Sequence, residues 1–97
     1  MSKVFWTIDS LVVKDNVLFG FGWIFHAQHE IVSLRFRVMS TESEVPEYIY
    51  ADFGKPREDV GRNYLNYPSA LNSGYVVFGA LPDARHLDCI ALECALE

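Results

Sequence analysis

The chain has 97 residues, of which 51% are hydrophobic and 14% aromatic, so it holds enough apolar material for one core and too few residues for a second domain. Its formal net charge is −5 and it has no run of basic residues, which argues against nucleic acid and anionic membrane surfaces as partners. No stretch has the length of a membrane span or the features of a signal peptide. We expect a single domain over residues 1–97, located in the cytoplasm. Because the last strand-like run ends without a closing turn, we also expect this domain to be excised from a longer protein.

The first part of the chain has the two-residue period of β-strands. Residues 4–13 predict one strand and residues 17–25 a second, and the polar residues Lys14, Asp15 and Asn16 between them predict a hairpin turn. One row of the second strand is bulky and the other is nearly bare, so we expect the bulky row, with Trp23, to face the core. The bulky row consists of Val17, Phe19, Phe21, Trp23 and Phe25.

The rest of the chain alternates between strands and turns. Residues 32–38 predict a half-buried strand with a basic outer face, and residues 48–51 predict a short strand. Residues 52–73 show no sustained period, but a proline followed by acids favours a short helix over residues 56–64. Two further strands are expected at residues 75–81 and 87–96. The pattern predicts an all-β fold, a small antiparallel β-sandwich of the Ig-like or jelly-roll-like kind, with about six or seven strands and one short helix in the long loop.

The sequence contains no convincing catalytic or metal motif. His26, His29 and Glu30 have the residue types of a ligand cluster, but they fall in a turn where solvated polar residues are expected, and zinc needs a further ligand. Cys89 and Cys94 lie five residues apart in one apolar strand, so their side chains point to opposite faces and we expect two reduced thiols. We therefore predict a domain that is not an enzyme and binds no metal or cofactor.

The loop region has the composition of a recognition surface. All five tyrosines lie between Tyr48 and Tyr75, interleaved with asparagine and serine. Tyrosine offers a rigid ring for stacking and the amides offer hydrogen bonds, a combination that suits a sugar. The alternative is that the tyrosines only pack the loop onto the sandwich. The predicted ligand-binding residues are Tyr50, Tyr64, Asn66, Tyr67 and Asn72.

Arg57 and Asp59 form a second notable pair. Residues two apart do not face each other on a helix, so each is expected to find its own partner. We expect Asp59 to help cap the short helix and Arg57 to brace a neighbouring loop.

Several short motifs together resemble a family of small carbohydrate-binding-like β-sandwich domains appended to bacterial polysaccharide glycosyltransferases of the O-antigen or capsule type. The resemblance spans most of the chain, although an aromatic position where phenylalanine is expected holds Tyr75. It implies that Trp23 is a core residue, that Gly22 and Gly74 allow close backbone approach, and that Arg57 and Asp59 brace loops. The motifs are Gly22 with Trp23, the strand 31–38, Arg57 with Asp59 and Val60, Tyr67 with Pro68, and Ser73 with Gly74 and Tyr75.

Two functions follow from these observations. The first is a non-catalytic accessory module that holds an oligosaccharide or nascent glycan beside an adjoining glycosyltransferase domain. The alternative is a docking or scaffolding domain that binds other proteins and no sugar. An exposed aromatic shelf within residues 48–75 would favour the first, and a flat apolar patch or a bare sheet edge would favour the second.

Overall fold

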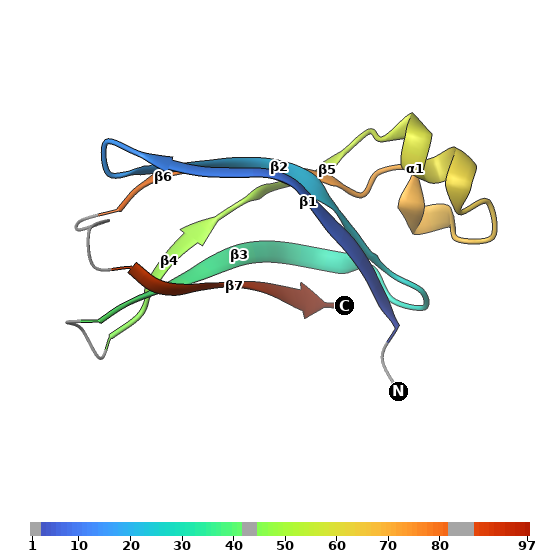
Figure 1. The fold of residues 1–97 in the computed structure, drawn as a ribbon. Coiled ribbons are helices and arrows are strands. Elements are labelled where there is room, and N and C mark those ends of the chain that lie inside the picture. Colours follow the sequence, from blue (N-terminus) through green and yellow to red (C-terminus); the bar gives the residue numbers. More distant parts are fainter. Residues whose placement is uncertain (1–2, 42–44, 82–86) are drawn as a thin grey trace.

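The computed structural model describes residues 3–41, 45–81 and 87–97, and its strands form two antiparallel sheets packed face to face (Figure 1). The predicted small antiparallel β-sandwich is thereby confirmed. One sheet contains, in order, β1 (Val4–Lys14), β2 (Val17–His26), β6 (Gly74–Ala80) and β5 (Asp52–Lys55). The other contains β4 (Glu47–Tyr50), β3 (Ile31–Ser40) and β7 (Leu87–Leu96).

The hairpin of β1 and β2 forms as the turn residues predict. Asp15 and Asn16 have positive φ angles of 52° and 61°, the conformation that a two-residue hairpin turn requires and that Asp and Asn tolerate. The pairing register shifts between Ile8 and Ser10, which leaves Asp9 in a β-bulge. A side chain in a bulge is re-aimed, and Asp9 becomes part of an ion-pair network described below.

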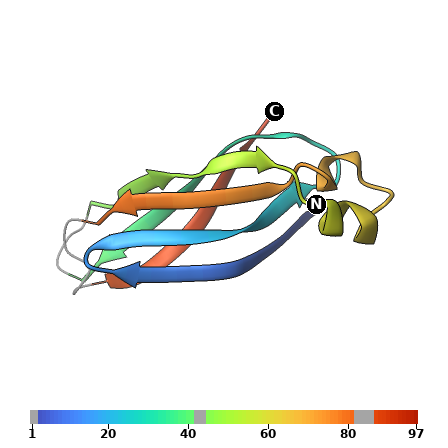
Figure 2. The ribbon, with the colours of Figure 1, turned by 90° about the horizontal axis from the view of Figure 1, so that it is seen from above.

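A short helical segment follows β5 and lies at one end of the four-stranded sheet (Figures 1 and 2). It consists of the helix α1 (Glu58–Asn63) and the 3-10 turn η1 (Pro68–Ala70), and we call residues 57–72 the cap. The predicted helix is present but shorter than expected. The sequence pattern did not predict β5 or η1, because residues 52–73 show no sustained period.

The structure reverses the predicted orientation of β2. Leu18 and Ile24 are buried in the core with the positions of Gly20 and Gly22 between them, whereas Phe19 and Phe21 remain 42% and 41% exposed on the outer face. The expectation that the bulky row faces the core was therefore wrong. Trp23 also lies on this outer row, where it is half-buried under the cap rather than between the sheets.

The reason lies in the volume that the other strands bring to the core. Phe36 from β3 and Tyr75 from β6 fill the space between the sheets with their rings 5.8 Å apart. A Cβ on Gly22 would lie 2.7 Å from the Tyr75 hydroxyl oxygen, so the bare row of β2 is what makes room for this ring. Residues that look too small for a core strand are thus the ones that face it.

Both cysteines of β7 are free, as predicted. Cys94 pairs with Leu34 and packs against the core, and burial raises the pKa of its thiol. Cys89 pairs with Met39 and is exposed, so neither thiol is placed to form a disulfide with the other. Among the described residues, no helix is long and apolar enough to cross a membrane.

Candidate functional site

The cap covers the outer face of the four-stranded sheet at one end, over Phe5, Trp23 and Phe25. Beneath it lies a second hydrophobic cluster, separate from the core between the sheets, in which Phe25 is 1% exposed. The Phe25 ring stacks on Phe5 with a centroid distance of 5.1 Å and on Trp23 at 5.9 Å. The remaining members of the cluster are Val60, Ala70, Tyr64 and Tyr67. Aromatic packing therefore anchors the cap to the ends of β1 and β2.

The structure separates the predicted ligand-binding residues into three places. Tyr64 and Tyr67 belong to the cap, with ring centroids 5.3 Å and 5.7 Å from that of Phe25, and are partly buried. Asn66 and Asn72 are exposed in the same segment. Tyr50 lies on β4 of the other sheet, where its hydroxyl is 3.5 Å from Nη1 of Arg35. The cap tyrosines use their rings for packing, and they do not form one shelf with Tyr50.

The remainder of this outer face has no such cover from the described residues. Figure 2 looks onto this sheet from above and shows the cap at one end, with no other described segment lying over the strands. Phe19 meets Phe21 and Phe78 edge to face, with ring centroids 6.4 Å and 6.2 Å apart. Cross-strand pairing places their neighbours on the same side. We call this surface the phenylalanine face: Val12, Phe19, Phe21, Val76 and Phe78, each between 38% and 70% exposed.

Sequence reasoning missed this face, although one signal pointed to it. In the β6 strand both rows are apolar: Tyr75 and Val77 are buried in the core, and Val76 and Phe78 point outward. A strand that is apolar on both sides is typical of a sheet that is covered on both faces. In the described structure only one face of this part of the sheet is covered.

An arginine network marks the boundary between the cap and the phenylalanine face. Nη1 of Arg57 donates to Asp9 at 2.9 Å, and Nε and Nη2 donate to the two carboxylate oxygens of Asp59 at 3.0 Å and 2.8 Å. A Cβ at Gly74 would lie 2.9 Å from Cγ of Arg57, so the absence of a side chain there lets the arginine lie against β6. Arg57 thus ties the cap to the bulge of β1.

The expectation that Arg57 and Asp59 find separate partners was wrong. Arg57 is the residue before the helix, with a φ of −136°, so helical spacing does not govern the direction of its side chain. No side chain caps the first turn by hydrogen bonding, and the Asp59 carboxylate binds the guanidinium instead. This hydrogen-bonded partner lowers the pKa of Asp59 to about 2, and Asp59 together with Asp9 raises the pKa of Arg57.

The ion pair between Arg57 and Asp59 predicts how the stability of the fold depends on pH in acid. A carboxyl group whose pKa is lowered by folding stabilises the fold above its unfolded pKa, here 3.8, and this contribution is lost as the pH falls towards 2. Between pH 5 and pH 2, Asp59→Asn should therefore lose less stability than the wild type. Urea unfolding at several pH values measures the difference. Glu58→Gln removes a carboxylate from the same helical turn without touching the Arg57 pair and is the matched comparison. Parallel curves for Asp59→Asn and the wild type would refute the pairing.

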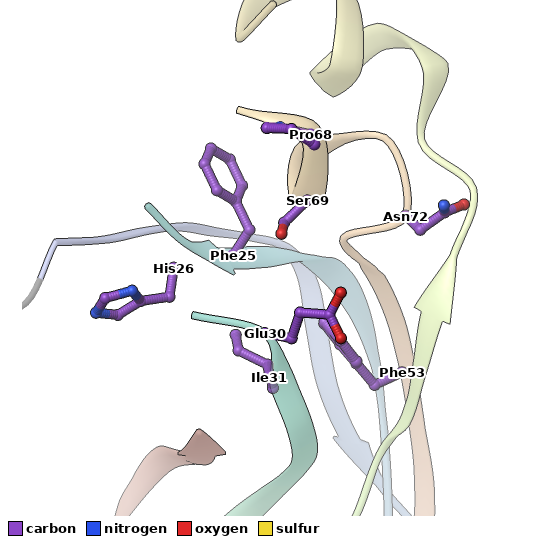
Figure 3. Close-up of a pocket in the computed structure, with 8 residues that line it drawn as sticks. All are labelled: Phe25, His26, Glu30, Ile31, Phe53, Pro68, Ser69 and Asn72. Atoms are coloured by element: carbon purple, nitrogen blue, oxygen red, sulfur yellow. The ribbon is translucent and has the colours of Figure 1, made fainter. Parts of the chain in front are cut away.

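A pocket lies between the end of β2, the start of β3 and η1. This open pocket has a volume of about 280 Å³. Figure 3 shows the Glu30 carboxylate and the Ser69 hydroxyl on facing sides of this space, with Phe53 beside Glu30. Of the predicted ligand-binding residues, Asn72 is the one that lines it. The full lining consists of Phe25, His26, Glu30, Ile31, Phe53, Pro68, Ser69 and Asn72.

His26 has a structural role in the turn beside this pocket. It is buried, and its Nδ1 accepts hydrogen bonds from the main-chain N–H groups of Gln28 at 3.0 Å and His29 at 3.1 Å. Nδ1 is therefore occupied, and the proton of the neutral ring resides on Nε2. Within residues 3–41, 45–81 and 87–97, no three histidine, cysteine, aspartate or glutamate side chains gather as a metal site.

The fold and these two surfaces define a small two-sheet β-module with an apolar outer face and a shallow polar pocket at one end. Comparisons with protein-family models, with curated proteins and with solved structures each return no match to this chain. The function therefore has to be argued from the surfaces themselves.

Proposed function

We propose that this domain is a non-catalytic docking module that binds another protein through the phenylalanine face. The observation that carries the proposal is the contiguity of three exposed phenylalanine rings on the outer face of one sheet. Exposed apolar patches of this kind mark interaction sites in water-soluble proteins, and phenylalanine is enriched at the centres of protein interfaces. The two free cysteines support a reducing, cytoplasmic setting for this function.

The chemistry of the face defines the partner that it suits. The five side chains of the face carry no charge and no hydrogen-bonding group, so they gain little from a polar ligand. A sugar needs hydrogen-bond partners at the edges of a stacking ring, and phenylalanine supplies none. An apolar, weakly charged protein surface buries the rings without leaving polar groups unpaired. Protein docking therefore accounts for this face better than sugar binding does.

Matched lysine variants test this proposal. Phe78→Lys places a charge on the phenylalanine face. Trp6→Lys is the control, because Trp6 is an exposed apolar residue outside this face. Trp6 pairs with buried Ile24 and therefore lies on the inner row of β1. A partner isolated on the wild-type domain should be purified and titrated by calorimetry. We expect Trp6→Lys to bind it like the wild type and Phe78→Lys to bind at least about tenfold more weakly. Equal binding by the wild type and Phe78→Lys would refute the proposal.

A second candidate function is the binding of a small polyhydroxylated ligand, such as a unit of a bacterial surface glycan, in the pocket. Asn72 favours it, because this predicted ligand-binding residue lines the same pocket as the Glu30 carboxylate, the Ser69 hydroxyl and two phenylalanines. In this case the domain would serve an adjoining glycosyltransferase domain by holding its glycan.

Nuclear magnetic resonance titration tests the second candidate. Mono- and oligosaccharides added to isotope-labelled protein should shift the amide signals of Ser69 and Asn72, with a dissociation constant on the order of 0.1 to 1 mM for a single shallow site. Glu30→Gln should weaken the response, and Glu58→Gln, outside the pocket, should not. A broad glycan panel that shifts none of the pocket signals at millimolar concentration would exclude this candidate.

A further inference from the structure

We propose that the partner of the phenylalanine face is a second copy of this chain, bound face to face about a two-fold axis. This inference rests on the docking function proposed above and specifies its partner. In such a dimer the two four-stranded sheets pack with their outer faces about 10 Å apart, as sheets do in a sandwich. Each contact occurs twice, because a two-fold interface brings the same surface patch from both copies together.

The charges at the rim of the face favour a second copy. Lys14 and Asp15 lie at the hairpin end, Lys55 pairs with Asp52 at 2.7 Å on the β5 edge, and Arg57 pairs with Asp9 at 2.9 Å at the cap. These three positive and three negative groups cancel, although the whole chain has a net charge of −5. Adding Asp59, which shares Arg57, gives these rim residues, all of them in the described part of the chain, a net charge of −1.

A balanced rim matters because identical surfaces meet in a homodimer. Two copies of a strongly negative rim would repel each other, whereas a rim of paired opposite charges can meet its own copy without a net penalty. A partner recruited by charge would call for a rim of one sign. The described rim residues are close to neutral, so the rim favours a second copy over a basic partner.

The size of the face sets the expected strength of the dimer. The exposed parts of three phenylalanines and two valines amount to on the order of 400 Å². A stable interface buries about 800 Å² on each partner, so the apolar centre supplies roughly half of that and the rim must supply the rest. We therefore expect a reversible dimer with a dissociation constant on the order of 10 μM to 1 mM.

Sedimentation velocity of the full chain tests this inference. Wild-type protein between roughly 10 μM and 1 mM should shift from monomer to dimer. Phe78→Lys should raise the dissociation constant at least about tenfold, since the two-fold axis places two lysines in one apolar interface. Trp6→Lys, on the inner row of β1, should dimerise like the wild type. Circular dichroism confirms that each variant is folded.

A second measurement needs no variant. Amide signals of isotope-labelled wild-type protein should move with concentration at Phe19, Phe21 and Phe78 and stay fixed on β7. A wild type that remains monomeric at about 1 mM would overturn the second-copy inference, as would a dimer broken by Trp6→Lys and not by Phe78→Lys. A monomer leaves the docking function standing if the purified partner still binds the wild type and not Phe78→Lys. If the wild type neither dimerises nor binds the purified partner through this face, the docking function itself is refuted.

Discussion

Phe25→Ala is expected to lower the free energy of unfolding by about 3–5 kcal/mol. Phe25 is 1% exposed and its ring contacts Phe5, Trp23, Tyr64 and Tyr67, so its removal leaves a cavity in the cluster that holds the cap. Small domains have a total stability of about 5–15 kcal/mol, so the loss is a large part of it. Urea unfolding followed by tryptophan fluorescence measures it, and Trp23 in the same cluster reports the change directly.

Phe78→Ala is the matched control for this prediction. Phe78 has the same side chain and lies on the same outer face, but it is 70% exposed, so its truncation should cost less than about 1 kcal/mol in the monomer. The measurement should be made at low micromolar concentration, where self-association does not contribute. Similar losses for the two variants would show that the cap does not bury Phe25.

Gly22→Ala is expected to destabilise the domain by about 3 kcal/mol or more. The added Cβ would overlap the main-chain oxygen of Thr7 in the paired strand and lie 2.7 Å from the hydroxyl oxygen of Tyr75. The Thr7 oxygen belongs to the backbone of β1, so relief requires the hairpin itself to shift. Thermal and urea unfolding monitored by circular dichroism measure the effect.

Gly79→Ala and Tyr75→Phe separate the causes of that effect. A Cβ at Gly79 would lie 2.7 Å from Cγ2 of Ile49, a side chain that can move, so its cost should be about 1 kcal/mol. Adding Tyr75→Phe to Gly22→Ala removes the hydroxyl contact but not the backbone overlap, so it should restore only part of the loss. Full restoration would show that the Tyr75 hydroxyl, rather than the β1 backbone, excludes a side chain at Gly22.

Local patterns in the sequence were sufficient to predict most of the strands and the first hairpin. A two-residue period reports that a segment is extended, and Asp15 with Asn16 can adopt the positive φ angles that the turn requires, so neither inference needs distant residues. The same reasoning placed a helix within residues 56–64 and two free cysteines on β7. These features depend on residues that are close together in the chain.

Only the tertiary structure decided which row of β2 faces the core. Both rows are apolar or small, so the period shows that a strand exists and not which side is buried. The volume of Phe36 and Tyr75, brought from β3 and β6, selects the glycine row and turns Phe19 and Phe21 outward. The candidate sites have the same origin. The phenylalanine face is formed by residues from β1, β2 and β6, and the pocket brings Glu30 and Asn72 together although they are far apart in the chain. Both sites exist because folding brings distant residues together, and no local sequence pattern encodes that.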